Sequence, residues 1–200
     1  MGSPTVTNIL HGPVIVYTAP VGESVPADSV AAGTAWGGNW ARIGLTKAPL
    51  TAGYEFEEGE AMVEEALTAV KRWKTKEDLT LETTLAEITA EYLEMAWGGT
   101  NTTTAAGAGQ VAKDELDLGG EATLEELAWG FEGIYTDSSG TEFPVRVFVH
   151  KATAKANGEL EFGRESEFPG IPIQIKALAD LGQSQGERLF KFQRVTAAAT

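Results

Sequence analysis

The residues that could do chemistry in this chain are its carboxylates, its lysines and arginines, and two histidines. Acid–base catalysis or metal binding needs a histidine or a carboxylate held beside a second polar group. His11 and His150 are far apart in the sequence, and neither is flanked by a ligand or nucleophile pattern. No phosphate-binding glycine motif and no nucleophile signature occurs. The sequence therefore predicts no catalytic residue, no metal site and no cofactor.

Charged residues form one ordered arrangement, in which an acidic block precedes a basic block. Six glutamates with no basic residue between them make the acidic block: Glu55, Glu57, Glu58, Glu60, Glu64 and Glu65. The basic block follows: Lys71, Arg72, Lys74 and Lys76. One interpretation is a solvated hairpin whose two strands neutralise each other. The other is a projecting arm that presents charge to another copy of the chain, where complementary charge would fix register.

Composition sets the class of protein. A chain of 200 residues that is 42% hydrophobic can bury a core, and a single domain over residues 1–200 is expected. There is no cysteine, which removes disulfides and thiolate ligands. No apolar run is long enough to span a membrane. The formal net charge of −14 has the wrong sign for a protein that binds DNA through its phosphates.

Apolar and polar residues alternate in several segments, which predicts a mainly β protein. Strands are predicted at residues 13–17, 78–85, 127–135, 141–152, 158–163, 171–177 and 188–195. The third and fourth of these are separated by a turn around Gly140 and should form a hairpin. Seven or eight strands favour an antiparallel sandwich or half-barrel.

One helix is predicted, at residues 85–97, to pack against this sheet in an α+β arrangement. Thr84 and Glu87 have capping-box spacing, and Gly98 follows its end. Trp97 and Trp129 lie in periodic patterns and are predicted to be core residues. The remaining segments are predicted to be an N-terminal arm (1–12), loops at 21–39 and 99–109, a long projecting loop (46–77) and a flexible C-terminal tail (196–200).

Four short segments, in this order, resemble the tail tube proteins of long-tailed bacteriophages and gene transfer agents. Residues 40–46 (WARIGLT) resemble an opening W-x-x-I-G-x-T element of that family, and residues 53–57 (GYEFE) resemble its next strand. Residues 70–88 resemble its strand leading into a helix, and residues 168–192 resemble its closing strands. The resemblance covers roughly residues 10–195.

The resemblance implies a structural protein of the virion tail, assembled in the host cytoplasm. Six subunits would form a ring around a lumen, and rings would stack into a tube that holds a tape-measure protein and later conducts double-stranded DNA. Tail terminator and baseplate or tail-tip proteins would be further partners, and no membrane is involved. Inter-ring contact is then assigned to Glu55, Glu57, Glu58, Glu60, Lys71, Arg72 and Lys74. Glu82 and Gln174, on the polar faces of long strands, are the candidate lumen residues.

Two other functions stay open from the sequence. A capsid-decoration or tail-terminator protein on a similar β scaffold would form closed rings or trimers but no long tubes. A soluble carbohydrate-binding β-sandwich would need an exposed aromatic platform. The five tryptophans are the candidates for that platform. With Trp97 and Trp129 predicted to be core, Trp73 and the pair Trp36 and Trp40, which flank Gly37 and Gly38, remain.

Overall fold

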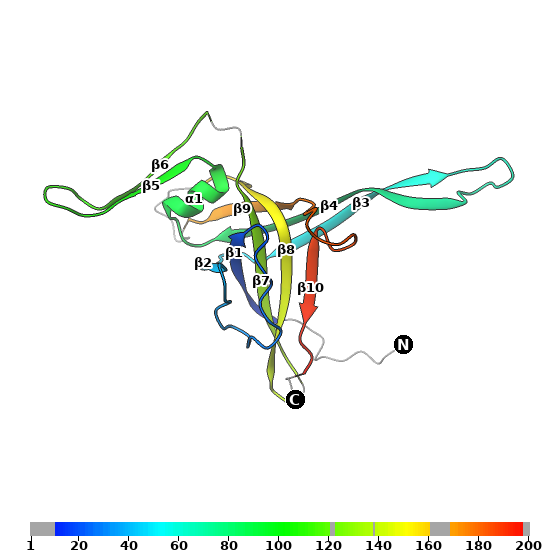
Figure 1. The fold of residues 1–200 in the computed structure, drawn as a ribbon, viewed down its shortest axis with the longest axis horizontal. Coiled ribbons are helices and arrows are strands. Elements are labelled where there is room, and N and C mark those ends of the chain that lie inside the picture. The colour runs from blue at the N-terminus through cyan, green and yellow to red at the C-terminus, as the bar shows by residue number, and fades with distance from the viewer. Residues whose placement is uncertain (1–10, 121–122, 138, 161–168, 198–200) are drawn as a thin grey trace.

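The structure is a computed structural model that describes residues 11–120, 123–137, 139–160 and 169–197. Ten strands and one helix follow one another along the chain (Figure 1). They are β1 (His11–Pro20), β2 (Ala41–Ile43), β3 (Thr51–Ala61), β4 (Lys71–Leu85), α1 (Ala90–Trp97), β5 (Thr100–Thr104), β6 (Lys113–Asp117), β7 (Glu126–Thr136), β8 (Glu142–Ala156), β9 (Ile171–Ala177) and β10 (Phe190–Arg194).

Eight of the strands form one antiparallel sheet in the order β2-β1-β7-β8-β9-β4-β3, and β10 also pairs with β8. The long strand β8 has β7 on one edge, and its other edge is shared. Val145–Val149 pair with β10, whereas Ala152–Ala156 pair with β9. The sheet divides there, so that β9, β4 and β3 cross the direction of β1, β7 and β8 (Figure 1). The predicted mainly β, antiparallel fold with one helix is confirmed.

The core lies where the two parts of the sheet meet. Alternate residues of β4 and β9 are buried and pair across the strands, as Leu81 does with Ile175 and Leu85 with Ile171. Trp129 of β7 is fully buried among them, as predicted. The predicted strand at 171–177 matches β9, and the predicted hairpin matches β7 and β8. Residues 158–160 are not a strand, and the rest of the strand predicted at 158–163 lies outside the described residues.

The predicted helix boundary was wrong. Helix α1 starts at Ala90, and its N-cap is Thr89, whose hydroxyl accepts a hydrogen bond from the Tyr92 amide at 3.2 Å. Leu85 belongs to β4 instead, because pairing with β9 continues to that residue. The two residues of the expected capping box instead accept hydrogen bonds from the loop between β2 and β3. The Thr84 carbonyl accepts from the Lys47 amide, and the Glu87 carboxylate accepts from the Leu45 amide.

Replacing Thr89 by alanine should destabilise the protein by about 1 kcal/mol, the usual effect of losing an N-cap oxygen. Amide hydrogen exchange in the first turn of α1 should accelerate with it, because the Tyr92 amide loses its acceptor. The matched control is Thr84→Ala, which should leave exchange in α1 unchanged. Faster exchange in α1 for the Thr84 variant would restore the capping-box interpretation.

Two β ribbons extend from the core toward opposite ends of the molecule in Figure 1. The segment predicted as a projecting loop, 46–77, does project, but it is largely the β3–β4 ribbon. Residues 71–78 of β4 pair with β3 alone, because β9 pairs only with the stretch from Thr80 to Leu85. The second ribbon, β5–β6, replaces the loop predicted at 99–109, and Trp97 beside it is 42% exposed instead of buried.

The two predicted terminal segments lie largely outside the described residues. Residues 1–10 of the arm are not described, and its last two residues already belong to β1. Of the tail at 196–200, residues 198–200 are likewise outside the described part.

Candidate assembly surfaces

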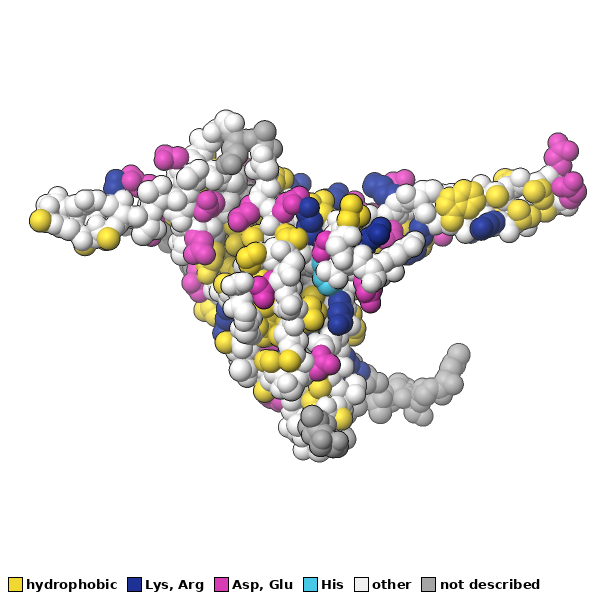
Figure 2. Space-filling view, viewed as in Figure 1, with side chains coloured by type: hydrophobic (Ala, Val, Ile, Leu, Met, Phe, Trp, Pro, Cys, Tyr) yellow, Lys and Arg dark blue, Asp and Glu magenta, His cyan; other side chains and the backbone are white. Residues whose placement is uncertain are grey.

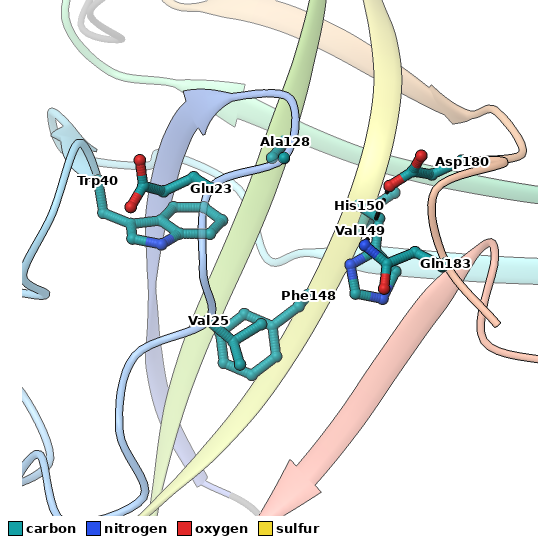
Figure 3. Close-up of a pocket in the computed structure, with 10 residues that line it drawn as sticks. Glu23, Val25, Trp40, Ala128, Phe148, Val149, His150, Asp180 and Gln183 are labelled. Atoms are coloured by element: carbon teal, nitrogen blue, oxygen red, sulfur yellow. Dashed lines mark hydrogen bonds between the residues drawn. The ribbon is translucent and has the colours of Figure 1, made fainter.

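A small pocket lies beside His150 (Figure 3). His150 lies on β8 at the division between β9 and β10, and the carboxylates of Glu23 and Asp180 also line the pocket. The cavity has a volume of about 10 Å³, which is room for one water molecule at most. The buried Nε2 of His150 has no partner within the described protein, and a water there would supply one. This pocket cannot hold a substrate. A second pocket of about 420 Å³ shares His150 with it and is also lined by Glu187 and Lys191.

Burial lowers the pKa of His150 below 6.5, and Asp180 and Glu187 oppose the shift. Lys191 adds to the lowering. The folded state thus favours the neutral imidazole, so this stabilisation is present above the unfolded pKa and is lost as the pH falls through the folded pKa. A histidine NMR titration should give His150 a pKa below 6.5. His150→Gln should weaken the dependence of the unfolding temperature on pH between pH 7 and 5. An unchanged dependence would contradict this prediction.

Within the described ranges, no three histidine or carboxylate side chains are grouped closely enough to hold a metal ion. No helix in the described part of the chain has the length and apolar character of a membrane span.

The acidic and basic blocks lie side by side on the β3–β4 ribbon and pair within one chain. Glu57 contacts Lys76 at 3.2 Å, and Glu60 contacts Arg72 at 2.8 Å. Arg72 also lies 3.9 Å from Glu58. All of these side chains are well exposed, so each pair adds little to stability. Among the described residues, neither Glu55 nor Lys71 makes an ion pair.

Lys74 makes a different set of contacts, because a bulge between Glu57 and Glu58 in the pairing places it on the aromatic face of the ribbon. Its ammonium donates to the Tyr54 hydroxyl at 2.6 Å and to Glu77 at 2.9 Å. It also lies about 5 Å from the ring centroids of Tyr54 and Phe56. The Tyr54 hydroxyl and the Glu77 carboxylate raise the pKa of Lys74.

Apolar residues on the same ribbon were missed when only its charges were considered. Tyr54 and Phe56 are 41% and 47% exposed, and Leu67 at the tip is fully exposed. Met62, Val63 and Val70 beside it are also exposed. The signal was present in the sequence as the AMVEEALTAV stretch, which includes the end of the acidic block and precedes the basic block. An isolated two-stranded ribbon with such side chains in water is typical of a surface that another molecule covers.

The two candidate lumen residues lie directly opposite each other on neighbouring strands. Glu82 of β4 pairs with Gln174 of β9, and the Gln174 amide donates to the Glu82 carboxylate at 2.7 Å. Asn157 donates to the same oxygen at 3.0 Å. The face that they share also carries an ion pair of Asp78 with Lys176 at 2.9 Å. This face therefore has charges of both signs.

The loop at 21–39 is not loosely held, and the tryptophans proposed as an exposed platform are buried. Trp36 and Trp40 are 4% and 8% exposed and pack with Tyr17 and Phe148. The Trp36 ring lies directly on Gly130 of β7 and leaves no room there for a side chain. The prediction that Trp36 and Trp40 are exposed was wrong, whereas Trp73 on the β3–β4 ribbon is 46% exposed. The carbohydrate-binding alternative therefore loses the pair of neighbouring tryptophans on which it mainly rested.

A buried ion pair also holds this loop. Arg146 and Glu132 have fully buried side chains and meet at 2.7 Å. Arg146 donates to the Val30 carbonyl at 2.6 Å, and Glu132 accepts from the Gly33 amide at 2.8 Å and from the Trp36 indole at 3.1 Å. No sequence pattern paired these two residues, because they come from neighbouring strands and close on a loop about a hundred residues away.

A β-sheet core with two ribbons beyond it and an exposed apolar ribbon tip is typical of a chain that another molecule covers in an assembly. The family model described as phage tail tube protein matches residues 8–196, nearly the whole chain. The chain belongs to the phage tail tube protein family, which is a structural family of the virion tail and not a known enzyme family. A comparison with curated proteins finds no match.

Proposed function

We propose that this chain forms hexameric rings that stack into the tail tube, the conduit through which the phage genome leaves the virion. The observation that carries the proposal is the β3–β4 ribbon, whose large apolar side chains are exposed beyond the core. Membership of the tail tube family supports the tube as the product of assembly. In a ring, neighbouring copies would also cover the open edges of strands β3 and β10, which are a risk of aggregation in an isolated sheet.

The β3–β4 ribbon is proposed to contact the next ring. Its charged residues Glu55, Glu57, Glu58, Glu60, Lys71, Arg72 and Lys74 would lie in or beside that contact. Because most of them already pair within the ribbon, their expected role is to set register and reject wrong partners more than to add affinity.

Exchanging the charges of the two cross-strand pairs tests this role. The variant E57K/K76E/E60R/R72E keeps both pairs within the ribbon and the net charge of the chain, but it reverses the pattern shown to other copies. We expect a folded protein that does not form tubes, as read by circular dichroism and electron microscopy. The double variant E57K/E60R is a poorer test. Its new basic side chains would face Lys76 and Arg72 across the ribbon, and like charges opposite each other destabilise a strand pair. Normal tubes from the exchanged variant would make the charges a solvated face only.

The polar face with Glu82 and Gln174 is proposed to line the lumen. Double-stranded DNA would pass without binding, since the face offers no excess of basic residues. The tape-measure protein would occupy the lumen before the genome does, and tail terminator and tip proteins would close the two ends. Assembly would take place in the host cytoplasm. A density map of a tube in which basic side chains line the lumen would contradict this assignment.

Negative-stain electron microscopy of the purified protein over a range of concentrations tests the function itself. Hollow tubes of uniform width, or six-fold rings, are the expected result. Closed rings or trimers that never elongate would favour a tail-terminator or decoration protein. Particles that stay monomeric at every concentration, even with a preformed tail tip added as initiator, would overturn the proposal.

A further inference from the structure

A groove lies at the base of the β3–β4 ribbon, where the ribbon leaves the core. One wall is the aromatic face of the ribbon, with Tyr54 and Lys74, and the other is the end of β9 with the connection to β10, including Leu178 and Phe190. Its volume is about 760 Å³, which exceeds those of the two pockets lined by His150. Tyr54 and Phe190 are both more than a third exposed, so apolar surface in the groove is uncovered in the single chain.

Basic side chains outnumber acidic ones in the lining of this groove. Lys74, Lys76 and Arg188 line it, and Glu77 is its one acidic lining residue. Lys74 is paired with Glu77 and Lys76 with Glu57, so Arg188 supplies the positive charge that is left for another molecule. Figure 2 shows basic side chains gathered at this junction of ribbon and core. Arg188 has no carboxylate partner among the described residues; its Nε contacts only the Gln183 carbonyl, at 3.5 Å. In a chain with a net charge of −14, an apolar groove with an arginine that lacks a carboxylate partner suits an occupant that is both apolar and acidic.

The tip of the same ribbon has that composition. Leu67, Met62 and Val63 are exposed there, and Glu64 and Glu65 lie between them in the sequence with no basic residue nearer than Lys71. Figure 2 shows acidic side chains at the end of the ribbon and hydrophobic ones along it. The β5–β6 ribbon is a poorer match, because its turn consists mainly of alanine and glycine, with Val111 as its one large apolar residue.

We propose that the tip of the β3–β4 ribbon of one copy occupies the groove at the base of this ribbon on a second copy. The inference rests on the proposed function and names the receiving surface for the ribbon. A tip cannot fold back into its own groove, because the paired strands carry it away from the core (Figure 1). Tip and groove are different surfaces, so the contact is head-to-tail and each copy can bind one neighbour on each side.

The length of the ribbon sets the spacing between the two copies. The strand from Tyr54 in the groove to Met62 at the tip spans about 26 Å, at roughly 3.3 Å per residue. Copies joined in this way are therefore offset along the ribbon by a distance of that order. Repetition of the contact produces stacking, which is the step from a ring to a tube.

Disulfide cross-linking tests the contact directly, because the natural chain has no cysteine. One protein carries Leu67→Cys at the tip and a second carries Gln185→Cys in the groove lining, and both positions are exposed. Mixed under mild oxidation, they should form a disulfide-linked pair at least tenfold faster than Leu45→Cys with Gln185→Cys. Leu45 is an exposed apolar residue away from the ribbon tip and serves as the matched control. Circular dichroism checks that each variant is folded.

Four outcomes separate the possibilities. Faster linkage of Leu67→Cys to Gln185→Cys supports the contact, provided that the two cysteine sites come close enough for a disulfide only when the tip is seated. Faster linkage of Val111→Cys to Gln185→Cys would assign the groove to the β5–β6 ribbon and overturn the proposal. Tubes without preferential linkage of either pair would also overturn it while leaving the proposed function intact. Preferential linkage of the Leu67 pair without tubes or rings would instead contradict the tube function.

Discussion

Replacing Arg146 by leucine should lower the free energy of unfolding by about 3–5 kcal/mol, the usual effect of breaking a buried ion pair from one side. Glu132 would stay fully buried without its cation, although the Gly33 amide and the Trp36 indole still donate to it. The Val30 carbonyl would lose its donor as well, so the loop at 21–39 should open before the rest of the sheet. Urea unfolding and amide exchange in that loop measure both effects.

Two control variants distinguish the effect of the buried ion pair from other effects of the substitution. Arg72→Leu removes an exposed arginine that also pairs with glutamate, and it should cost about 1 kcal/mol or less. The double variant Glu132→Leu/Arg146→Leu removes both buried charges and should recover most of the lost stability. Equal losses for Arg146→Leu and Arg72→Leu would mean that the pair is open to water in solution. A double variant as unstable as the single one would assign the loss to the loop contacts.

Trp36→Ala should destabilise the protein by about 3–5 kcal/mol, the range for large-to-small changes at buried aromatic residues. The Trp36 ring stacks on Tyr17 with centroids 4.1 Å apart and meets Trp40 edge-on at 5.2 Å. Its indole also donates to Glu132, so the substitution removes a donor from the buried carboxylate. In the natural protein the Trp36 ring lies so close to Gly130 that a side chain at position 130 would collide with the ring. Loss of the ring would therefore leave a cavity over Gly130.

The matched control is Trp97→Ala, a change of the same side chain at a position that is 42% exposed. It should cost about 1 kcal/mol, because little packing is lost at the surface. Thermal unfolding of the two variants side by side is sufficient, and similar losses would contradict the burial of the loop tryptophans. The result also bears on function. If Trp36→Ala kept its stability, Trp36 would not be a core residue and would again be a candidate for an exposed aromatic platform.

Local pattern was a good guide where a strand is half buried. In β9, Ile171, Ile173 and Ile175 alternate with polar or exposed positions, and the sequence shows this directly. The turn between β7 and β8 is also local, and so the hairpin could be predicted. The family resemblance had the same source, since it rests on short segments in a fixed order, and the match over residues 8–196 confirms it.

Local pattern failed where two structures compete for the same residues. Thr84 and Glu87 have the spacing of a helix start, yet cross-strand pairing with β9 keeps the chain extended through Leu85. A partner strand that arrives about ninety residues later in the sequence cannot be seen from a helix pattern. The prediction that Trp36 and Trp40 are exposed failed for a similar reason. Trp36 lies in a segment rich in glycine and alanine and is buried only because Tyr17 and Phe148 meet there.

The candidate assembly surfaces divide in the same way. The sequence by itself determined that an acidic and a basic block would lie on one projecting segment, because both blocks are continuous in the chain. Only the tertiary structure decided that Glu57 meets Lys76 and Glu60 meets Arg72 within that segment, since the register and bulge of β3 on β4 fix those neighbours. The groove was equally invisible, because Tyr54, Lys74 and Arg188 come together only when the end of β9 folds beside the ribbon. Charge order is a property of the chain, whereas a surface that can receive another copy is a property of the folded sheet.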